Sequence, residues 1–323
     1  MYLNDINFSL WADFIERDFL KGKFKELIAS GVVNGATSNP AIFKNAFLGS
    51  KAYEAQKQEL GLKGKALYEA LAITDIQMAA DILKPLYDKG DDGFVSIEVD
   101  PFFCDDTAAT IEEGLSLYKA IDRPNVMIKV PATNAGYEAM RTLLGKGIHV
   151  NATLVFSFAQ AKKIMDAYKA ANPPAGTKLV ISVFISRFDR MLDEQLPDDL
   201  KGMAGVLNAS KIYNMVEKAG YKDVKTLFAS TGVKSPYYAP SYYVDELIGA
   251  NAINTAPIET IDAFVANGEK TPVLPRDDAK IDQFFMVLNS RGINFQGVCD
   301  ELLEDGLLQF KDAFKEIIKA LEA

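Results

Sequence analysis

Histidine and cysteine are scarce in this 323-residue sequence, which holds one histidine, His149, and two cysteines, Cys104 and Cys299. A Ser-His-Asp site would have to use that one histidine, and a zinc site with several histidine ligands is excluded. The two cysteines do not have the spacing of metal ligands. We therefore expect no metal site, and we interpret His149 as a residue at the start of a strand that hydrogen-bonds to the backbone.

The sequence also lacks long apolar runs and an excess of positive charge. No run approaches the roughly 20 residues of a membrane-spanning helix, and the first residues, MYLNDINFSL, lack the basic start and apolar core of a signal peptide. The 44 acidic residues outnumber the 35 basic ones, which disfavours nucleic acid or an anionic membrane as a partner. We expect a cytoplasmic protein that is a monomer or a homodimer.

What the sequence does contain is a regular alternation of apolar runs with segments of helical character. Apolar residues make up 49% and charged residues 24%, as in an average globular protein. Eight of the runs have the length and composition of buried strands. They span residues 7–13, 32–38, 93–100, 125–131, 149–156, 178–186, 225–231 and 251–256.

Helix signals lie between these strands. Thr74 with Gln77, and Ser157 with Gln160, have the spacing of a capping box, in which a hydroxyl and an amide side chain satisfy the first backbone N–H groups of a helix. Each pair precedes a segment with helical periodicity. Both pairs therefore predict the start of a helix.

Alternation of strand and helix predicts a parallel sheet with right-handed crossovers. Eight such units predict an α/β fold, a (β/α)8 TIM barrel with additional N- and C-terminal helices. Residues 1–323 would form this single domain, with residues 277–323 as extra C-terminal helices packed outside the barrel. The alternative is an open doubly wound sheet, which is disfavoured because no glycine-rich dinucleotide fingerprint follows an early strand.

Polar residues fall near the carboxyl ends of nearly all these strands, where TIM barrels carry their active sites. Singly, each has a plain alternative. Asn39 before a proline suits a turn, and Asp13 could cap a helix. Glu98 and Lys129 could form a structural ion pair. Together, acid, amide, amine and hydroxyl groups predict a lined pocket. The residues are Asp13, Ser38, Asn39, Glu98, Asp100, Lys129, Thr153, Ser182, Ser186, Ser230 and Thr231.

Lys129 interrupts the fourth strand, between apolar residues of VMIKVPATN. A solvated lysine has a pKa of about 10.4, whereas an amine that burial keeps neutral is a nucleophile. A neutral amine attacks a ketone to give a Schiff base, whose protonated nitrogen draws electrons from the adjacent carbon–carbon bond. The reaction also needs carboxylates to move protons. Asp13 and Glu98, from different strands, complete a set of two acids and one amine.

Motifs along the whole chain resemble those of transaldolases, the class I aldolase-type transferases of the pentose phosphate pathway. The motifs are GATSNPAIF around Asn39, FVSIEVDP around Glu98, VMIKVPAT around Lys129, VNATLVFSFAQA around Thr153 and LVISVFISRFD around Arg187. They occur in the order found in the family. SLWADFI near the start and ASTGVKSP near residue 232 resemble the longer bacterial subgroup.

The resemblance implies a barrel that carries a dihydroxyacetone unit as a Schiff base on Lys129. It also implies that Asp13 is the base for carbon–carbon cleavage and that Glu98, assisted by Thr153, activates water. The donor would be sedoheptulose 7-phosphate or fructose 6-phosphate, and the acceptor glyceraldehyde 3-phosphate or erythrose 4-phosphate. Sugar hydroxyl groups would be bound by Asn39, Asn151 and Ser182.

Phosphate would be held near Arg187, which follows the sixth strand where SRFD opens a helix. Its guanidinium and free backbone N–H groups can face one anion. The plain alternative is an ion pair of Arg187 with Asp189 or Asp193. Ser230 and Lys234 lie after the seventh strand, where barrels often hold phosphate. Other transaldolases carry an arginine two residues after this serine, whereas this sequence has Lys234 further along.

Three other functions are possible readings of the same motifs. A fructose 6-phosphate aldolase would release dihydroxyacetone, but that related group has a tyrosine at Phe184 and a glutamine at Glu98. A phenyl ring has no hydroxyl to hold a proton-donating water, which favours transfer. A non-catalytic barrel that binds sugar phosphate would not need a neutral amine. A cofactor-dependent ketol transferase would need thiamine diphosphate, for which no motif is present, so no cofactor is expected.

Overall fold

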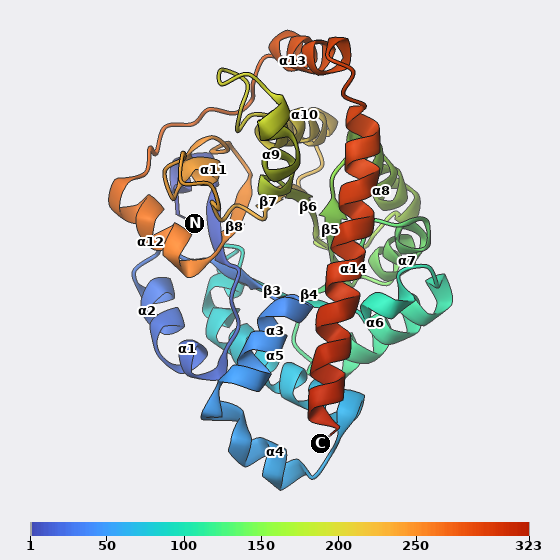
Figure 1. Cartoon of the computed structure of the whole chain (residues 1–323). Coiled ribbons are helices and arrows are strands. Elements are labelled where there is room, and N and C mark those ends of the chain that lie inside the picture. The colour runs from blue at the N-terminus through green and yellow to red at the C-terminus, as the bar shows by residue number, and fades with distance from the viewer. Residues whose placement is uncertain (1, 323) are drawn as a thin grey trace.

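Eight parallel strands close into a barrel in the computed structural model, which describes residues 2–322 (Figure 1). Each strand pairs with the next in sequence, and the eighth pairs with the first. The strands are β1 (Ser9–Ala12), β2 (Gly35–Thr37), β3 (Phe94–Glu98), β4 (Val126–Pro131), β5 (His149–Val155), β6 (Leu179–Phe184), β7 (Val224–Ala229) and β8 (Ile253–Ala256). All eight predicted strands are confirmed, each shorter than its apolar run, and the alternative of an open sheet is wrong.

Helices surround the barrel, and the predicted fold class is confirmed. They are α1 (Arg17–Lys21), α2 (Lys23–Ala29), α3 (Pro40–Gly49), α4 (Glu54–Leu60), α5 (Gly64–Asp88), α6 (Thr107–Ile121), α7 (Asn134–Gly145), α8 (Phe158–Ala171), α9 (Ser186–Leu192), α10 (Ala204–Ala219), α11 (Tyr242–Asp245), α12 (Ile258–Asn267), α13 (Asp278–Ser290) and α14 (Phe295–Leu321). Short 3-10 helices are η1 (Asn4–Ile6), η2 (Lys51–Tyr53), η3 (Pro101–Phe103) and η4 (Asp193–Gln195). Within residues 2–322, none of the helices combines the length and apolarity that crossing a membrane requires.

The two predicted capping boxes have different outcomes. Ser157 caps α8: its hydroxyl accepts a hydrogen bond from the N–H of Gln160, whose side chain accepts one from the N–H of Ser157. Thr74 instead lies inside α5, which begins already at Gly64, and its hydroxyl donates to the carbonyl of Ala70. The prediction at Thr74 is wrong because a threonine inside a helix can bond back to its own preceding turn.

His149 has the structural role expected of it. It begins β5, and its Nδ1 accepts a hydrogen bond from the backbone N–H of Lys178 at 2.9 Å. Its ring contacts Phe94 edge-on, with centroids 5.1 Å apart. Burial, and then the charge of Lys178, lower the pKa of His149 to about 4. The ring is therefore neutral at pH 7 and lies at the amino-terminal end of the barrel, opposite the predicted site.

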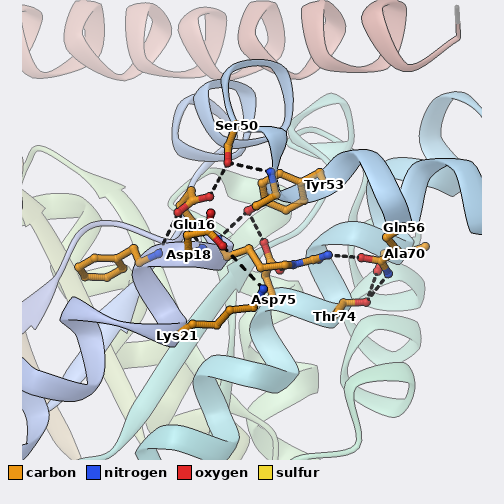
Figure 2. Close-up of polar contacts among 12 residues, drawn as sticks. Glu16, Asp18, Lys21, Ser50, Tyr53, Gln56, Ala70, Thr74 and Asp75 are labelled. Carbon is orange, nitrogen blue, oxygen red and sulfur yellow. Dashed lines mark hydrogen bonds and ion pairs between the residues drawn. The ribbon is translucent and has the colours of Figure 1, made fainter.

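A buried polar network fixes the segment that follows β1 (Figure 2). The guanidinium of Arg17 donates to one oxygen of Asp75 through Nε (2.9 Å) and Nη2 (2.7 Å), and Tyr53 donates to the other oxygen (2.6 Å). The hydroxyl of Tyr53 accepts in turn from the N–H of Arg17 (3.0 Å). The network joins α1, η2 and α5, and so anchors the chain just beyond Asp13.

The C-terminal helices occupy two places. α13 packs against α10 on the outside of the barrel. α14, the long red helix of Figure 1, runs from α9 past β5 to α3 and α5. At its far end Phe314 meets the ring of Tyr68 edge-on, with centroids 4.9 Å apart. α14 therefore crosses the carboxyl-terminal mouth of the barrel. Residues 1 and 323, the ends of the predicted domain, lie outside the described residues.

Candidate active site

Lys129 reaches the interior of the barrel because side chains alternate along β4. Met127 shares this inward face, whereas Ile128 points toward α6. The side chain of Lys129 is only 6% exposed. Its Nζ donates a hydrogen bond to the carbonyl of Ser38 at 3.0 Å and lies 5.8 Å from the ring centroid of Phe310. The amine is thus held in a fixed place with little access to water.

Glu98 lies beside Lys129 because β3 and β4 pair with these two residues in register. Its Oε2 is 3.2 Å from Nζ of the lysine, so the ion pair weighed as a plain alternative does exist. Oε2 has no well-aligned hydrogen-bond donor. Burial raises the pKa of Glu98 to about 7, a shift that Lys129 opposes and that the charge of Asp13 adds to. The carboxyl can therefore take up or release a proton at neutral pH.

Asp13 follows β1 at the same end of the barrel. Its N–H donates to the carbonyl of Ala256 (2.9 Å), and its Oδ1 accepts from the hydroxyl of Thr37 (2.7 Å). The alternative that Asp13 caps a helix is wrong, because the side chain of Glu16 caps α1. Burial raises the pKa of Asp13, although Lys129 and then Thr37 lower it. The two acids thus share the charge of Lys129, but Asp13 alone accepts a hydrogen bond from Thr37.

Thr153 stands at an irregularity of the sheet. The register of β5 against β6 shifts between Ala152 and Val155, and Leu154 has a φ of +55°. Such bulges redirect side chains and are frequent beside active sites. Thr153 lines the pocket that contains Lys129, and within residues 2–322 its buried hydroxyl has no protein hydrogen-bond partner. The bulge thus places an unpaired hydroxyl at the wall of this pocket.

The amide and hydroxyl residues form hydrogen-bonded sets. Asn39 lines the pocket and also caps α3, since its Oδ1 accepts from the N–H of Ile42 (3.0 Å). Asn151 is fully buried beneath the pocket, donates to Ser96 (3.0 Å) and accepts from Ser182 (2.6 Å). Ser182 lines the pocket directly. Asn151 thus fixes Ser182 rather than contacting the open space.

Arg187 lines the same pocket, with its guanidinium 5.4 Å from the ring centroid of Phe184. Its ion pair is with Asp305 of α14, at 3.7 Å. The alternative of a pair with Asp189 or Asp193 is wrong, because both carboxylates accept hydrogen bonds from a tyrosine hydroxyl and a backbone N–H. The guanidinium is therefore left facing the pocket.

The predicted phosphate residues after β7 are divided between two pockets. Ser230 lines the pocket of Lys129 and shares a hydrogen bond of 3.0 Å with Ser186. Lys234 lines a neighbouring pocket together with Ser186. The pair of serines therefore lies between the two spaces, and the structure does not bring Lys234 to the amine of Lys129.

Most of the predicted site residues line one pocket at the carboxyl ends of the strands. Glu98 is not among the lining residues, but it contacts Lys129, which is. The lining residues are Asp13, Thr37, Asn39, Ala41, Lys129, Thr153, Ser182, Phe184, Arg187, Ala229, Ser230, Thr255, Gln309 and Phe310. Thr37 and Thr255, joined by a 2.6 Å hydrogen bond, lie within predicted strands, so strict alternation along those strands would have found them. Nothing in the sequence marks Gln309 and Phe310, which reach the pocket from α14.

Comparison with known proteins gives a consistent result. The family described as Transaldolase/Fructose-6-phosphate aldolase matches residues 10–321. The chain is similar to the transaldolase of Helicobacter pylori (strain P12), with 41% identity over 315 residues, 97% of this chain and 99% of the relative. It is similar to the transaldolase of Campylobacter jejuni subsp. jejuni serotype O:23/36 (strain 81-176), with 44% identity over 329 residues, 98% of this chain and 99% of the relative. The chain belongs to the transaldolase/fructose-6-phosphate aldolase family.

Proposed function

We propose that this chain is a transaldolase that forms its covalent intermediate on Lys129. The observation that carries the proposal is the buried contact of Nζ with Glu98 at 3.2 Å, in a pocket that Asp13 also lines. Burial raises the pKa of Glu98 to about 7, so its carboxyl can accept a proton beside the amine. An amine that has given up its proton attacks a ketone.

The reaction follows from these positions. The amine of Lys129 attacks the carbonyl carbon of a ketose phosphate, and the carbinolamine loses water to give an iminium ion. Glu98, with a water molecule held by Thr153, supplies and removes the protons of this step. Asp13 takes the proton from the hydroxyl on the fourth carbon, the bond between the third and fourth carbons breaks, and an aldose phosphate leaves. The iminium nitrogen accepts the electron pair, which leaves an enamine on the lysine.

Transfer then completes the cycle. An acceptor aldose phosphate enters, the enamine carbon attacks its aldehyde, and Asp13 returns a proton to the new hydroxyl. Hydrolysis of the iminium ion releases the product and frees Lys129. The ring of Phe184 has no hydroxyl to hold a water that could protonate the enamine, which favours transfer over release of dihydroxyacetone. Arg187 and Ser230 supply polar groups for the substrate phosphate.

We propose sedoheptulose 7-phosphate or fructose 6-phosphate as the donor, and glyceraldehyde 3-phosphate or erythrose 4-phosphate as the acceptor. Cys104 and Cys299 are both free thiols, which suits a reducing compartment, so we propose a cytoplasmic enzyme. We propose a monomer or a homodimer, since the pocket is complete within one chain.

Reduction with borohydride in the presence of fructose 6-phosphate tests the proposal. We expect a reduced three-carbon adduct on the peptide that contains Lys129, identified by mass spectrometry. The Lys129→Ala variant, shown to be folded by circular dichroism, should form no adduct and have no transferase activity. An adduct on another lysine, or activity in the variant, would refute the mechanism. Stoichiometric release of free dihydroxyacetone from the wild type without an acceptor would favour the aldolase instead.

A further inference from the structure

The pocket contains an arginine with an incomplete set of partners. The side chain of Arg187 is 11% exposed, and its Nη1 is buried without a hydrogen-bond acceptor. Burial lowers the pKa of Arg187, Arg190 lowers it further, and Asp305 opposes both effects. The nearest carboxylate is that of Asp305, at 3.7 Å, which is within reach of an ion pair but too long for a hydrogen bond. Within residues 2–322, Nη1 thus has an ion-pair partner in Asp305 but no hydrogen-bond acceptor.

α14 is built to bring Asp305 to this place. Gly306, the next residue, lies so close to the barrel that an added Cβ would be 2.9 Å from Leu154 Cδ2 and 3.3 Å from Arg187 Nη1. One turn further, the side chain of Gln309 donates a hydrogen bond of 2.6 Å to Oδ2 of Asp305 and also lines the pocket. The carboxylate is therefore held in place, while its side chain remains 47% exposed to solvent.

We propose that Asp305 is a specificity-determining residue: a fixed counter-ion of Arg187 with which a substrate phosphate must compete for the guanidinium. This inference rests on the proposed function, because it assumes that phosphorylated sugars enter the pocket. When the pocket is empty, Asp305 balances the charge of the buried guanidinium. When a phosphate dianion binds Arg187, the carboxylate becomes a like charge beside it. Asp305 thus weakens the binding of phosphate and speeds the release of phosphorylated products.

The Asp305→Asn variant tests this role because it removes the charge and keeps an oxygen that can accept from Gln309. We expect inorganic phosphate, titrated calorimetrically, to bind the variant roughly three- to tenfold more tightly at low salt, a range set by a partly exposed ion pair. The ratio of kcat/KM for fructose 6-phosphate to that for fructose should rise by a similar factor. Both gains should shrink at high ionic strength, because salt screens exposed charges.

Glu304→Gln is the matched control. Glu304 is the adjacent acidic residue on α14 and is exposed like Asp305, but the ion pair of Arg187 is with Asp305. It should leave phosphate binding and the ratio unchanged. Equal effects of the two variants, no effect of Asp305→Asn, or weaker phosphate binding by Asp305→Asn would each overturn the inference. Phosphate binding requires no turnover, so a wild type that binds phosphate but forms no adduct on Lys129 would refute the proposed function alone.

Discussion

At the scale of single residues, Glu98 is a carboxyl beside Lys129 whose protonation changes in the neutral range. Burial raises its pKa from 4.5 to about 7, because the loss of water outweighs the attraction of Lys129. If the carboxylate acts as the base, log kcat/KM should fall as the pH falls through about 7 and Glu98 takes up a proton. Glu98→Gln should remove this inflection and lower kcat/KM roughly 10²- to 10⁴-fold. The test is a pH–rate profile of both proteins on either side of pH 7.

Asp189 provides the control for that profile. Burial raises its pKa to about 7 as well, yet it lies outside the pocket of Lys129 and accepts a hydrogen bond from Tyr243 (2.7 Å). Asp189→Asn keeps an oxygen for that bond. We expect this variant to retain the inflection near pH 7. If the inflection disappeared in Asp189→Asn, with Glu98 intact, the titration would belong to Asp189 and not to Glu98.

Thr153 tests a role in catalysis apart from stability. Within residues 2–322 its buried hydroxyl has no protein hydrogen-bond partner. Thr153→Val keeps the shape and leaves no protein group unpaired, so the free energy of unfolding should change by less than about 1 kcal/mol. The same change should lower kcat/KM by about 10²-fold, because the water that we propose for Glu98 would lose a hydrogen-bond partner. Denaturant unfolding and steady-state kinetics measure the two effects.

Thr226→Val is the matched change elsewhere in the barrel. The hydroxyl of Thr226 in β7 is also buried and unpartnered, but the residue does not line the pocket. Its free energy of unfolding should change as little, with kcat/KM unaltered. A comparable loss of activity in both valine variants would show that the effect at Thr153 is not chemical.

At the scale of elements, the network that anchors α1 lets us compare two influences on stability. We expect the burial of an ion pair to matter more than the distance between its charges. The Arg17–Asp75 pair at 2.7 Å has side chains 8% and 0% exposed, and Tyr53 completes it. Asp75→Ala would leave a buried guanidinium and a buried hydroxyl unpaired. We expect this variant to lose about 3–5 kcal/mol of unfolding free energy in chemical denaturation.

The control pair has a shorter contact on the surface. Lys23 and Asp262 lie 2.6 Å apart, with side chains 45% and 51% exposed. Asp262→Ala should cost less than about 1 kcal/mol, because water already solvates both charges. Equal losses in Asp75→Ala and Asp262→Ala would contradict the argument from burial.

The strands could be predicted from the sequence, whereas the path of α14 could not. The strands were predictable because a parallel barrel buries both faces of each strand, and the polar exceptions Lys129 and Glu98 stand out in such runs. The helical character of α14 was predictable, but its path was not. Phe310 resembles any apolar residue of a helix, and its place over the amine depends on how closely Gly306 lets α14 approach the barrel.

At the scale of the whole molecule, the barrel has a lysine–carboxylate pair at each end, buried at the carboxyl-terminal end and partly buried at the other. Glu98 and Lys129 lie at the carboxyl-terminal end, at 3.2 Å. At the amino-terminal end Asp92 lies 2.8 Å from Lys225 and accepts a hydrogen bond of 3.2 Å from the indole of Trp11. The two pairs are chemically alike, and in TIM barrels the amino-terminal face contributes to stability while the opposite face carries the chemistry.

Asp92→Asn tests this division of the molecule. It removes the charge that pairs with Lys225, whose side chain is 17% exposed and so retains some access to water. We expect a loss of about 1–3 kcal/mol in unfolding free energy, less than for a fully buried pair. Trp11 is the only tryptophan, so its fluorescence reports the unfolding directly. Because Asp92 contacts no part of the pocket of Lys129, kcat/KM of the folded variant should remain that of the wild type. A large fall in kcat/KM without unfolding would instead mean that the charges at the amino-terminal end influence the Lys129 amine through the barrel interior.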